Sequence, residues 1–312
     1  MIVDKYTKGY ALQIEGLLNE AMSITRTLAY SFVENKDTSL NELNSINKRI
    51  LANALDKNKD FLSVWFDWEI NTIDPSQERG RVGNIMFRST NGQHVFERDI
   101  LVDEAVNATY NKLKENAKES VGEPYKDEIT EGLAGILMVS PTVPIKENGE
   151  FVGLAGIDLN MSHIQEIVKA IKPYENSIAY LISTGNAIVA HTNSTLHQKS
   201  LLEINPNHKN EYSQALQNVK KGDEHSFIYK NDENKNVYVS MLPINIGLDN
   251  EVWCLASETP LNDVLAKSNS IFYITIIIGL IGIIIFSLII FSIIKSVTKR
   301  LNWAVEHSTK NQ

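Results

Sequence analysis

The stretch Gly149–Ser162, GEFVGLAGIDLNMS, places one acid inside an apolar run. Its alternation predicts a strand in which Asp158 shares a face with Leu154 and Gly156, while Ile157 points to the other face. A buried carboxylate without a partner is costly in free energy. We therefore expect Asp158 to be satisfied either by backbone amides and a neighbouring cation, or by a ligand that is positively charged or donates hydrogen bonds.

A later region of the chain repeats the neighbourhood of this stretch. Two pairs of short segments match in letters and in order, with an offset of 100 or 101 residues. VSPTVPI at 139–145 recurs as VSMLPI at 239–244, and LAGIDLNMSHI at 154–164 recurs as LASETPLNDVL at 255–265. The repetition predicts a duplicated strand-loop-strand-helix unit, in which Asp158 falls opposite Thr259.

The first 270 residues show both helical and strand patterns. Apolar residues three and four apart predict a long amphipathic helix over 7–34 and a second helix over 41–55. Period-two alternation predicts strands, and the dipeptide Asn91-Gly92 is typical of a hairpin turn. The strands cover 61–69, 81–99, 132–145 and 151–160, and further helices cover 103–119 and 161–171, the latter capped by Ser162. The predicted fold class is α+β, with a long N-terminal helix, two α/β units in tandem and one transmembrane helix.

Length and composition exclude several classes of protein. At 312 residues the chain is long enough for two typical domains of about 150 residues each. Its 43% hydrophobic and 22% charged residues are typical of a folded chain with a packed core. A formal net charge of -8 argues against a nucleic-acid-binding surface. The single cysteine, Cys254, excludes an internal disulfide and lies in an apolar strand pattern, where we expect it to be buried.

The segment Ile271–Ile294 contains no charged residue and is longer than the roughly 20 residues that a helix needs to cross a bilayer. Lys295, Lys299 and Arg300 follow it directly, and this positive charge predicts that the C-terminal end lies in the cytoplasm. Residues 1–270 are then extracytoplasmic, and the predicted location is the cell inner membrane.

Export of residues 1–270 requires a signal sequence or an earlier span. The opening residues, MIVDKYTKGYALQIEGLL, contain neither an apolar signal region nor a cleavage site. We expect a first span that precedes this chain. The alternative is the opposite topology, in which the chain is a tail-anchored cytosolic protein.

Five stretches carry a resemblance to a known family. They are WFDWEIN at 65–71, GRVGNIMFR at 80–88, GEPYKDEI at 122–129, VSPTVPIKENGEFVGLAGIDLNM at 139–161 and KSVTKR at 295–300. Together with the long helix, the two α/β units and the span, they resemble the double Cache ligand-binding regions of bacterial transmembrane chemoreceptors, sensor histidine kinases and related signalling proteins. The resemblance covers nearly the whole chain.

The resemblance implies how the chain is divided. The parts are the helices of the sensor region over 1–58, a membrane-distal PAS-like Cache unit over 59–170, a membrane-proximal Cache unit over 171–268, the transmembrane helix over 271–294 and the start of a HAMP-like cytoplasmic linker over 295–312. It also implies a first span immediately before the long helix, a parallel homodimer in which the long helices pack together, and a cytoplasmic signalling module beyond residue 312.

The resemblance also implies a ligand site in the distal unit. Asp158 matches the aspartate that holds the ligand's ammonium group in amino-acid-binding members of the family. Those members have an Arg-x-Trp-Tyr pattern where this chain has Asn84, Met86 and Phe87. The arginine that binds the ligand's carboxylate is therefore absent at its position, which argues against the recognition of a plain amino acid.

Two arginines stand on either side of this gap, Arg81 and Arg88. Arg88 has the strand parity of Met86, so we expect it to pair with an acidic group of the ligand or to neutralise Asp158. A purely structural role for Arg88 is the alternative.

Aromatic side chains are the remaining site candidates. Trp65, Asp67 and Trp68 on the preceding strand would form walls that stack a planar ligand or cage an amine, or else the tryptophans belong to the core. Tyr125, next to Pro124, is expected to close the pocket from a loop, unless it is an ordinary surface tyrosine.

The sequence contains no pattern typical of catalysis or metal binding. It has no phosphate-binding glycine loop, no G-x-S-x-G elbow and no H-E-x-x-H helix. His191 and His197 lie in a polar loop without an acid placed to complete a metal site. We expect no enzyme activity, no cofactor, no metal and no nucleic-acid partner.

These observations predict the extracytoplasmic sensor region of a chemoreceptor-like receptor that binds an amine, an amino-acid derivative or a planar heterocycle. The sensor region of a histidine kinase or of another fused signalling enzyme is the alternative within the same class. A membrane-anchored enzyme, a tail-anchored protein and an adhesive ectodomain without a small ligand are the alternatives from other classes.

Overall fold

The computed structural model describes residues 2–34, 40–74, 76, 80–89, 91–101, 108–127, 130, 132–249 and 251–309. The chain separates into two units, Met1–Pro260 and Leu261–Gln312. The first unit contains two antiparallel sheets and most of the helices, and the second is formed by one long helix.

A helix of 33 residues, α1 (Ile2–Glu34), begins the first unit and begins five residues before the predicted Thr7. One side of α1 is fully buried, because its apolar residues recur every three or four positions. The members of this stripe are Ile14, Leu18, Ala21, Leu28 and Phe32. Helix α2 (Leu40–Lys57) buries Leu51 and Leu55 in the same core. The predicted long amphipathic helix is confirmed.

The first sheet follows α2 and has seven strands. Its order is β3-β2-β1-β7-β5-β4, with β6 paired to β7, and its strand pairs are antiparallel. The strands are β1 (Phe61–Glu69), β2 (Arg81–Arg88), β3 (His94–Leu101), β4 (Tyr125–Lys126), β5 (Leu137–Val139), β6 (Thr142–Glu147) and β7 (Glu150–Asn160). Two short helices, α3 (Ile70–Ile73) and α4 (Ala108–Asn116), lie between them in sequence.

The second sheet has five strands and is joined to the first by α5 (Met161–Ala170). Its order is β10-β11-β12-β8-β9, again antiparallel. The strands are β8 (Ile178–Ile182), β9 (Ile188–His191), β10 (His225–Lys230), β11 (Asn236–Ile246) and β12 (Glu251–Pro260). The helical segments η2 (Ser194–Leu196), α6 (Leu201–Ile204), η3 (Pro206–His208) and α7 (Lys209–Val219) connect β9 to β10.

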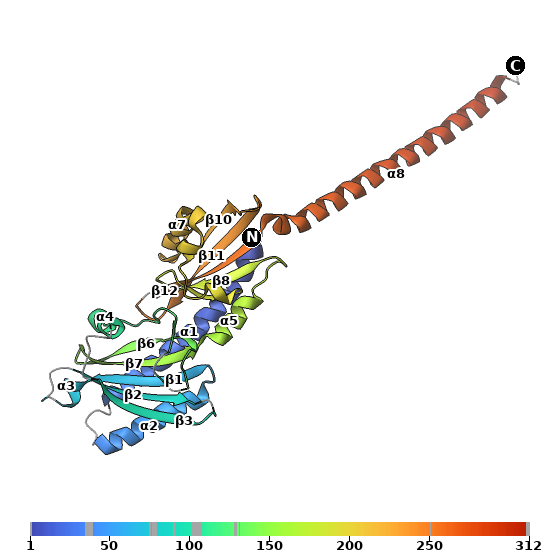
Figure 1. The fold of residues 1–312 in the computed structure, drawn as a ribbon. Helices are drawn as coiled ribbons and strands as arrows, with labels where there is room; N and C mark the ends of the chain where they lie inside the picture. The colour runs from blue at the N-terminus through green and yellow to red at the C-terminus, as the bar shows by residue number, and fades with distance from the viewer. Residues whose placement is uncertain are drawn as a thin grey trace. The chain divides into compact units, whose positions relative to one another are not determined.

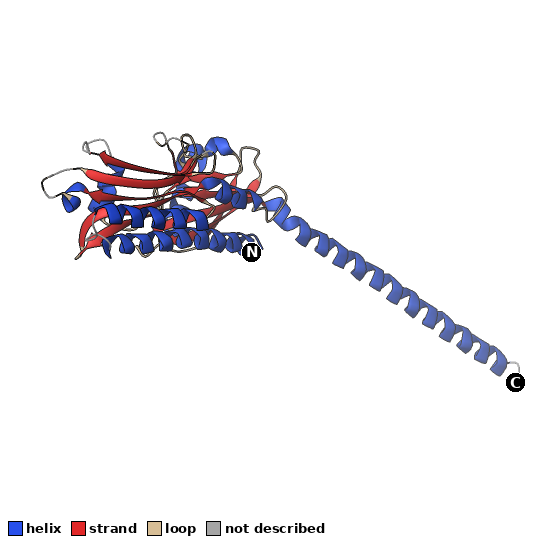
Figure 2. Ribbon diagram, turned by 90° about the horizontal axis from the view of Figure 1, so that it is seen from below, coloured by secondary structure: helices blue, strands red, loops and turns tan. Residues whose placement is uncertain are grey.

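Helix α1 covers one face of both sheets (Figure 1). In Figure 2, α1 and α2 run along one side of the strands, and the opposite side is left to loops and shorter helices. The largest hydrophobic core contains residues of α1, of the first sheet and of the second sheet together. A separate core lies on the other face of the second sheet, where Tyr212 and Leu216 of α7 pack against Val239 and Cys254. Cys254 is buried, as predicted.

The two sheets repeat one arrangement, a strand hairpin that is followed directly by a helix. In the first sheet β6 and β7 lead into α5, and in the second sheet β11 and β12 lead into α8 (Leu261–Thr309). The predicted duplicated unit is therefore present in the secondary structure. The expected equivalence of Asp158 and Thr259 is wrong, because counting back from the first helical residue places Asp158 opposite Glu258.

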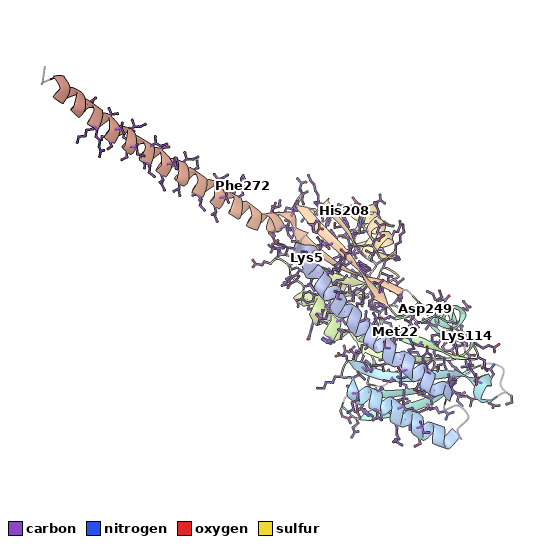
Figure 3. The ribbon with its side chains drawn as sticks, turned by 180° about the vertical axis from the view of Figure 1, so that it is seen from behind. Lys5, Met22, Lys114, His208, Asp249 and Phe272 are labelled. Atoms are coloured by element: carbon purple, nitrogen blue, oxygen red, sulfur yellow. The ribbon has the colours of Figure 1, made fainter. Side chains whose placement is uncertain are left out.

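Helix α8 has 49 residues. Its stretch Phe272–Arg300 is long and apolar enough to cross a membrane, and its most apolar window is not buried inside the structure. The predicted span 271–294 lies within α8, and Figure 3 labels Phe272 near its beginning.

Candidate functional site

Asp158 lies on β7, on the face of the first sheet that is turned away from α1. Its neighbours Ile157 and Leu159 belong to the core that contains α1, so the alternation of the strand directs Asp158 to the other side. It stands opposite Ser63 of β1 and is only 4% exposed. The predicted strand and the predicted burial of this carboxylate are therefore present.

Four neutral groups of the chain donate hydrogen bonds to Asp158. Its Oδ1 accepts from Ser140 Oγ at 2.6 Å, from Trp65 Nε1 at 3.1 Å and from Tyr125 OH at 3.2 Å. Its Oδ2 accepts from Ser63 Oγ. Burial raises the pKa of Asp158, while these donors oppose that rise. In the part of the chain that the structure describes, no cation forms an ion pair with this carboxylate.

The side chain of Trp65 depends on a glycine in the neighbouring strand. Trp65 pairs with Gly156, and a Cβ atom added to Gly156 would lie 2.1 Å from Cζ2 of the indole. The ring therefore occupies the space that any other residue at position 156 would fill. This contact holds the indole nitrogen of Trp65 at the carboxylate of Asp158.

Asp67 follows on the same face of β1 and is paired with a cation. Arg81 of β2 donates from Nη1 to Asp67 Oδ2, and both side chains are largely buried. Burial raises the pKa of Asp67, Arg81 opposes this rise, and the negative charge of Asp158 adds to it. Gly83 leaves room for this pair, since a Cβ there would lie 3.1 Å from Asp67 Oδ1.

A second polar cluster adjoins Arg81 at the end of β1. The guanidinium of Arg81 lies over the ring of Tyr110, with 4.5 Å between its carbon and the ring centroid. Tyr110 OH and Lys114 Nζ each lie 2.7 Å from a different oxygen of Glu69. Figure 3 labels Lys114. Each of these acids therefore has a cation at its side, in contrast to Asp158.

Tyr125 lies on β4, a short strand at the edge of the sheet. Its hydroxyl is within hydrogen-bond distance of both Asp158 and Ser140, and 39% of the residue is exposed. Burial of the hydroxyl raises the pKa of Tyr125, and the negative charge of Asp158 raises it further. Tyr125 thus donates its proton inward from the surface, and it does so from a strand rather than from the predicted loop.

Several predicted site residues lie on the opposite face of the sheet. Asn84, Met86 and Trp68 are buried on the side of α1 and α2, where Met86 and Trp68 belong to the core. The expected proximity of these three residues to Asp158 is wrong, because the register of β1 and β2 sets them one residue out of phase with Trp65 and Asp67.

The expectation that Arg88 neutralises Asp158 is also wrong. The guanidinium of Arg88 donates to the backbone carbonyls of Leu55 and Lys59, at the end of α2. Phe87, by contrast, does point to the Asp158 side, where it packs with Leu133 and Met138. The structure therefore brings together Asp158, Trp65, Asp67, Arg81, Phe87 and Tyr125, and it separates Asn84, Met86, Arg88 and Trp68 from them.

Ser63 and Ser140 were missed by the sequence reasoning, although both donate to Asp158. Ser63 has the strand parity of Trp65, which was an available signal. Ser140 lies in the first of the two repeated segments, but its approach to Asp158 depends on the pairing of β5 with β7, which places Val139 opposite Leu159.

A cavity beside the first sheet does not have Asp158 in its lining. It has a volume of about 220 Å³ and is lined by residues of α1, α5 and the turn between α2 and β1, His163 among them. In this structure Asp158 is instead enclosed by its own four donors, so a ligand that reaches it must displace at least one of them. Across the described residues, no group of three or more His, Cys, Asp or Glu could hold a metal ion.

Comparisons with known proteins agree with this architecture. The methyl-accepting chemotaxis protein TlpQ of Pseudomonas aeruginosa is 26% identical over 239 residues, which are 68% of this chain and 31% of that protein. The chain therefore corresponds to less than a third of that receptor's length.

Solved structures share the fold. One is the extracellular domain of mmHK1S-Z2, a protein assigned as a histidine kinase. It is 23% identical with a TM-score of 0.67, and the match covers 84% of this chain and 97% of that domain. The ligand-binding domain of the Pseudomonas aeruginosa PAO1 amino acid chemoreceptor PctC in complex with GABA is 19% identical with a TM-score of 0.54, covering 81% and 96%. The model of the Cache domain family matches residues 2–268 of this chain. The chain belongs to the Cache domain family, and it is similar to part of a chemotaxis receptor and to sensor domains of a histidine kinase and of a chemoreceptor.

Proposed function

We propose that this chain is the extracytoplasmic sensor region of a bacterial transmembrane receptor of the chemoreceptor type, and that its distal unit binds a small organic amine at Asp158. The observation that carries the ligand class is a fully buried carboxylate whose described partners are all neutral. A ligand ammonium would supply the missing positive charge in an environment of low dielectric, where such a pair is strong.

The surroundings of Asp158 support an amine over an amino acid. An amino acid would need a cation for its carboxylate, and both arginines near this region are engaged, Arg81 with Asp67 and Arg88 with the end of α2. PctC, an amino acid chemoreceptor, was solved with GABA, which carries a carboxylate as well as an ammonium group, so it supports the ammonium part of this proposal only. In this chain the side chains of Trp65 and Tyr125 would then contact the cation through aromatic surface.

The proposed arrangement follows the boundaries expected from the sequence. The distal unit is 59–170, the proximal unit is 171–268, the span is 271–294, and residues 295–312 begin a HAMP-like linker. The C-terminal end is cytoplasmic and leads to the output module, the membrane is the bacterial inner membrane, and the receptor is a homodimer. A histidine kinase output is the second candidate, favoured by the fold match to mmHK1S-Z2.

Calorimetric titration of the whole chain in lipid nanodiscs tests the ligand class. Primary amines and diamines should bind, whereas their carboxylic-acid counterparts and neutral alcohols of the same length should not. Asp158→Asn keeps the size of the side chain and removes its charge, so it should weaken amine binding at least tenfold. The matched control is Asp223→Asn, at an exposed position, which should leave binding unchanged. Equal amine affinity in the wild type and in Asp158→Asn would sink the proposed site.

A further inference from the structure

The second sheet contains a carboxylate in the same structural position as Asp158. Glu258 lies on β12 three residues before the first residue of α8, as Asp158 lies on β7 three residues before α5. Both face away from α1, since Glu258 alternates with Leu255 and Ser257, and Ser257 Oγ lies 2.8 Å from Thr7 of α1. The duplication has therefore placed an acid at one equivalent point in each sheet.

Glu258 is held by three tyrosines. Its Oε1 accepts from Tyr180 OH at 2.6 Å and from Tyr212 OH, and its Oε2 accepts from Tyr229 OH at 3.0 Å. Burial raises the pKa of each tyrosine, and the negative charge of Glu258 raises it further, so the three hydroxyls stay protonated. No lysine, arginine or histidine among the described residues forms an ion pair with Glu258.

The tyrosines belong to a larger aromatic group on this face. Tyr212 lies edge-on to Phe227 with 5.1 Å between centroids, Tyr229 lies 4.5 Å from the ring of His208, and Tyr180 stacks on His191 at 5.5 Å. These rings come from β8, β9, β10, α7 and the residue that precedes α7. His208 is labelled in Figure 3 on the second sheet's side of the molecule.

The group has an accessible side. Phe227 and Tyr229 lie on β10, the edge strand of the sheet, and both are partly exposed. Glu258 itself is 9% exposed, about twice the exposed fraction of Asp158. The rings of Tyr229 and His208 are in contact, so a small ligand would reach Glu258 Oε2 beside Tyr229, whose hydroxyl would turn from the carboxylate to accept a hydrogen bond from the ligand's ammonium.

We infer that Glu258 and its tyrosines form a second ligand site, specific for a small organic ammonium ion, in the proximal unit. This inference rests on the proposed function, because it extends to Glu258 the argument made for Asp158. Glu258 supplies the negative charge. The rings of Tyr212, Tyr229 and Phe227 supply aromatic surface for the cation, and the hydroxyl oxygens can accept hydrogen bonds from the ammonium.

The competing explanation is that the tyrosines only satisfy a buried structural acid. The two explanations differ in what Glu258→Gln does. Glutamine keeps an acceptor for the tyrosines but removes the charge, so it should abolish cation binding at this site while the fold persists. Tyr229→Phe keeps the ring at the accessible side and removes one hydroxyl, and should weaken binding several-fold with little effect on folding.

The experiment is isothermal titration of the whole chain in nanodiscs with ethanolamine and, separately, with choline, after circular dichroism has shown that each variant is folded. The wild type should bind two molecules per chain. Glu258→Gln and Asp158→Asn should each bind one, and the double variant none. If Glu258→Gln fails to fold, Tyr229→Phe provides the test, with a weakened second site expected.

The outcomes separate the two proposals. One site per chain that is lost in Asp158→Asn and unchanged in Glu258→Gln and Tyr229→Phe overturns this inference and leaves the proposed function standing. One site that is lost in Glu258→Gln and unchanged in Asp158→Asn overturns the distal assignment and supports the proximal one. Absence of binding of either cation to the wild type overturns both.

Discussion

At the scale of single residues, Asp158 combines two properties that rarely persist together without a function. It is almost fully buried, and its described partners are hydroxyls and an indole rather than a cation. Burial therefore raises its pKa even though four donors favour the ionised form. Binding of an ammonium favours the ionised form strongly, so ligand affinity and the protonation of Asp158 are linked.

This linkage predicts a pH dependence. Because the pKa of Asp158 is raised in the folded chain, its contribution to stability is present below the unfolded value of about 3.9 and is lost as the pH rises through the folded value. Amine affinity should change in the opposite direction, rising about tenfold per pH unit below the folded pKa and levelling off above it. Denaturant unfolding and amine titration, each carried out between pH 4 and pH 8, measure the stability and the affinity respectively. A rise of equal size in Asp158→Asn would contradict the assignment to this carboxylate.

A second prediction concerns Gly156. In Gly156→Ala the new methyl group meets the indole of Trp65 and forces the ring from its place, which should cost about 1–3 kcal/mol of stability and weaken amine binding. Gly16→Ala is the control, because nothing lies within 4 Å of a Cβ at that position of α1. Chemical denaturation should show the control at least as stable as the wild type. Equal stability of both variants would mean that Trp65 is not held by Gly156.

At the scale of secondary-structure elements, the sequence predicted what each segment is better than which way it faces. The helix α1, the strand β7, the strand-hairpin-helix repeat and the long apolar helix follow from local periodicity, and each is present. The face of β2 does not follow from periodicity alone. Phe87 and Arg88 alternate whichever way the strand is turned, and only the pairing of β1 with β2 decides that Phe87 shares the side of Asp158.

The candidate site was predictable only in part for the same reason. Trp65, Asp67 and Tyr125 were predicted as site residues, but the donors Ser63, Ser140 and Tyr125 come from separate segments that strand pairing brings to one carboxylate. An irregular register between Phe61 and Ser63 further shifts the start of β1. Contacts of this kind depend on long-range pairing, which a single sequence does not encode in any local pattern.

The corrected position of Arg88 leads to a third prediction. Its guanidinium joins the end of β2 to the last turn of α2 and the residues after it through the carbonyls of Leu55 and Lys59. Arg88→Met removes these donors, so it should lower stability by about 1–3 kcal/mol while leaving amine affinity unchanged. Denaturant unfolding and calorimetry of the same variant measure the two effects. Weaker amine binding by Arg88→Met at wild-type stability would show that Arg88 belongs to the ligand site.

At the scale of the first unit as a whole, the segment that carries Tyr125 also joins the two sheets. Glu119 accepts two hydrogen bonds from Arg26 of α1, at 2.5 and 2.7 Å, and one from the amide of Leu248. Close by, Met22 of α1 lies against Gly247 of the β11–β12 turn, and Figure 3 labels Met22 and the turn residue Asp249. A displacement of Tyr125 therefore acts on a segment that is fixed to both α1 and the second sheet.

Glu123, two residues before Tyr125, links the segment that carries Tyr125 to the second sheet. Its carboxylate accepts from Ser183 Oγ and from the amide of Gly185 at 2.8 Å, in the turn between β8 and β9. Since a bound amine must displace a donor such as Tyr125 from Asp158, we expect it to change hydrogen exchange at residues 183–187. In Glu123→Ala that change should disappear and stability should fall by about 1–3 kcal/mol. Glu233→Ala, at a fully exposed position, is the control and should behave as the wild type. An exchange response that survives in Glu123→Ala would place the coupling elsewhere.

The sharing of α1 by both sheets limits how this region can be recombined. A receptor chimera that exchanged only residues 59–170 would set a foreign sheet against a helix whose stripe was selected for its original partner. Transfer of ligand specificity between receptors of this type should therefore succeed only when the donor's α1 is transferred together with the donor's first sheet. The recipient's second sheet must then pack against the surface of the new helix.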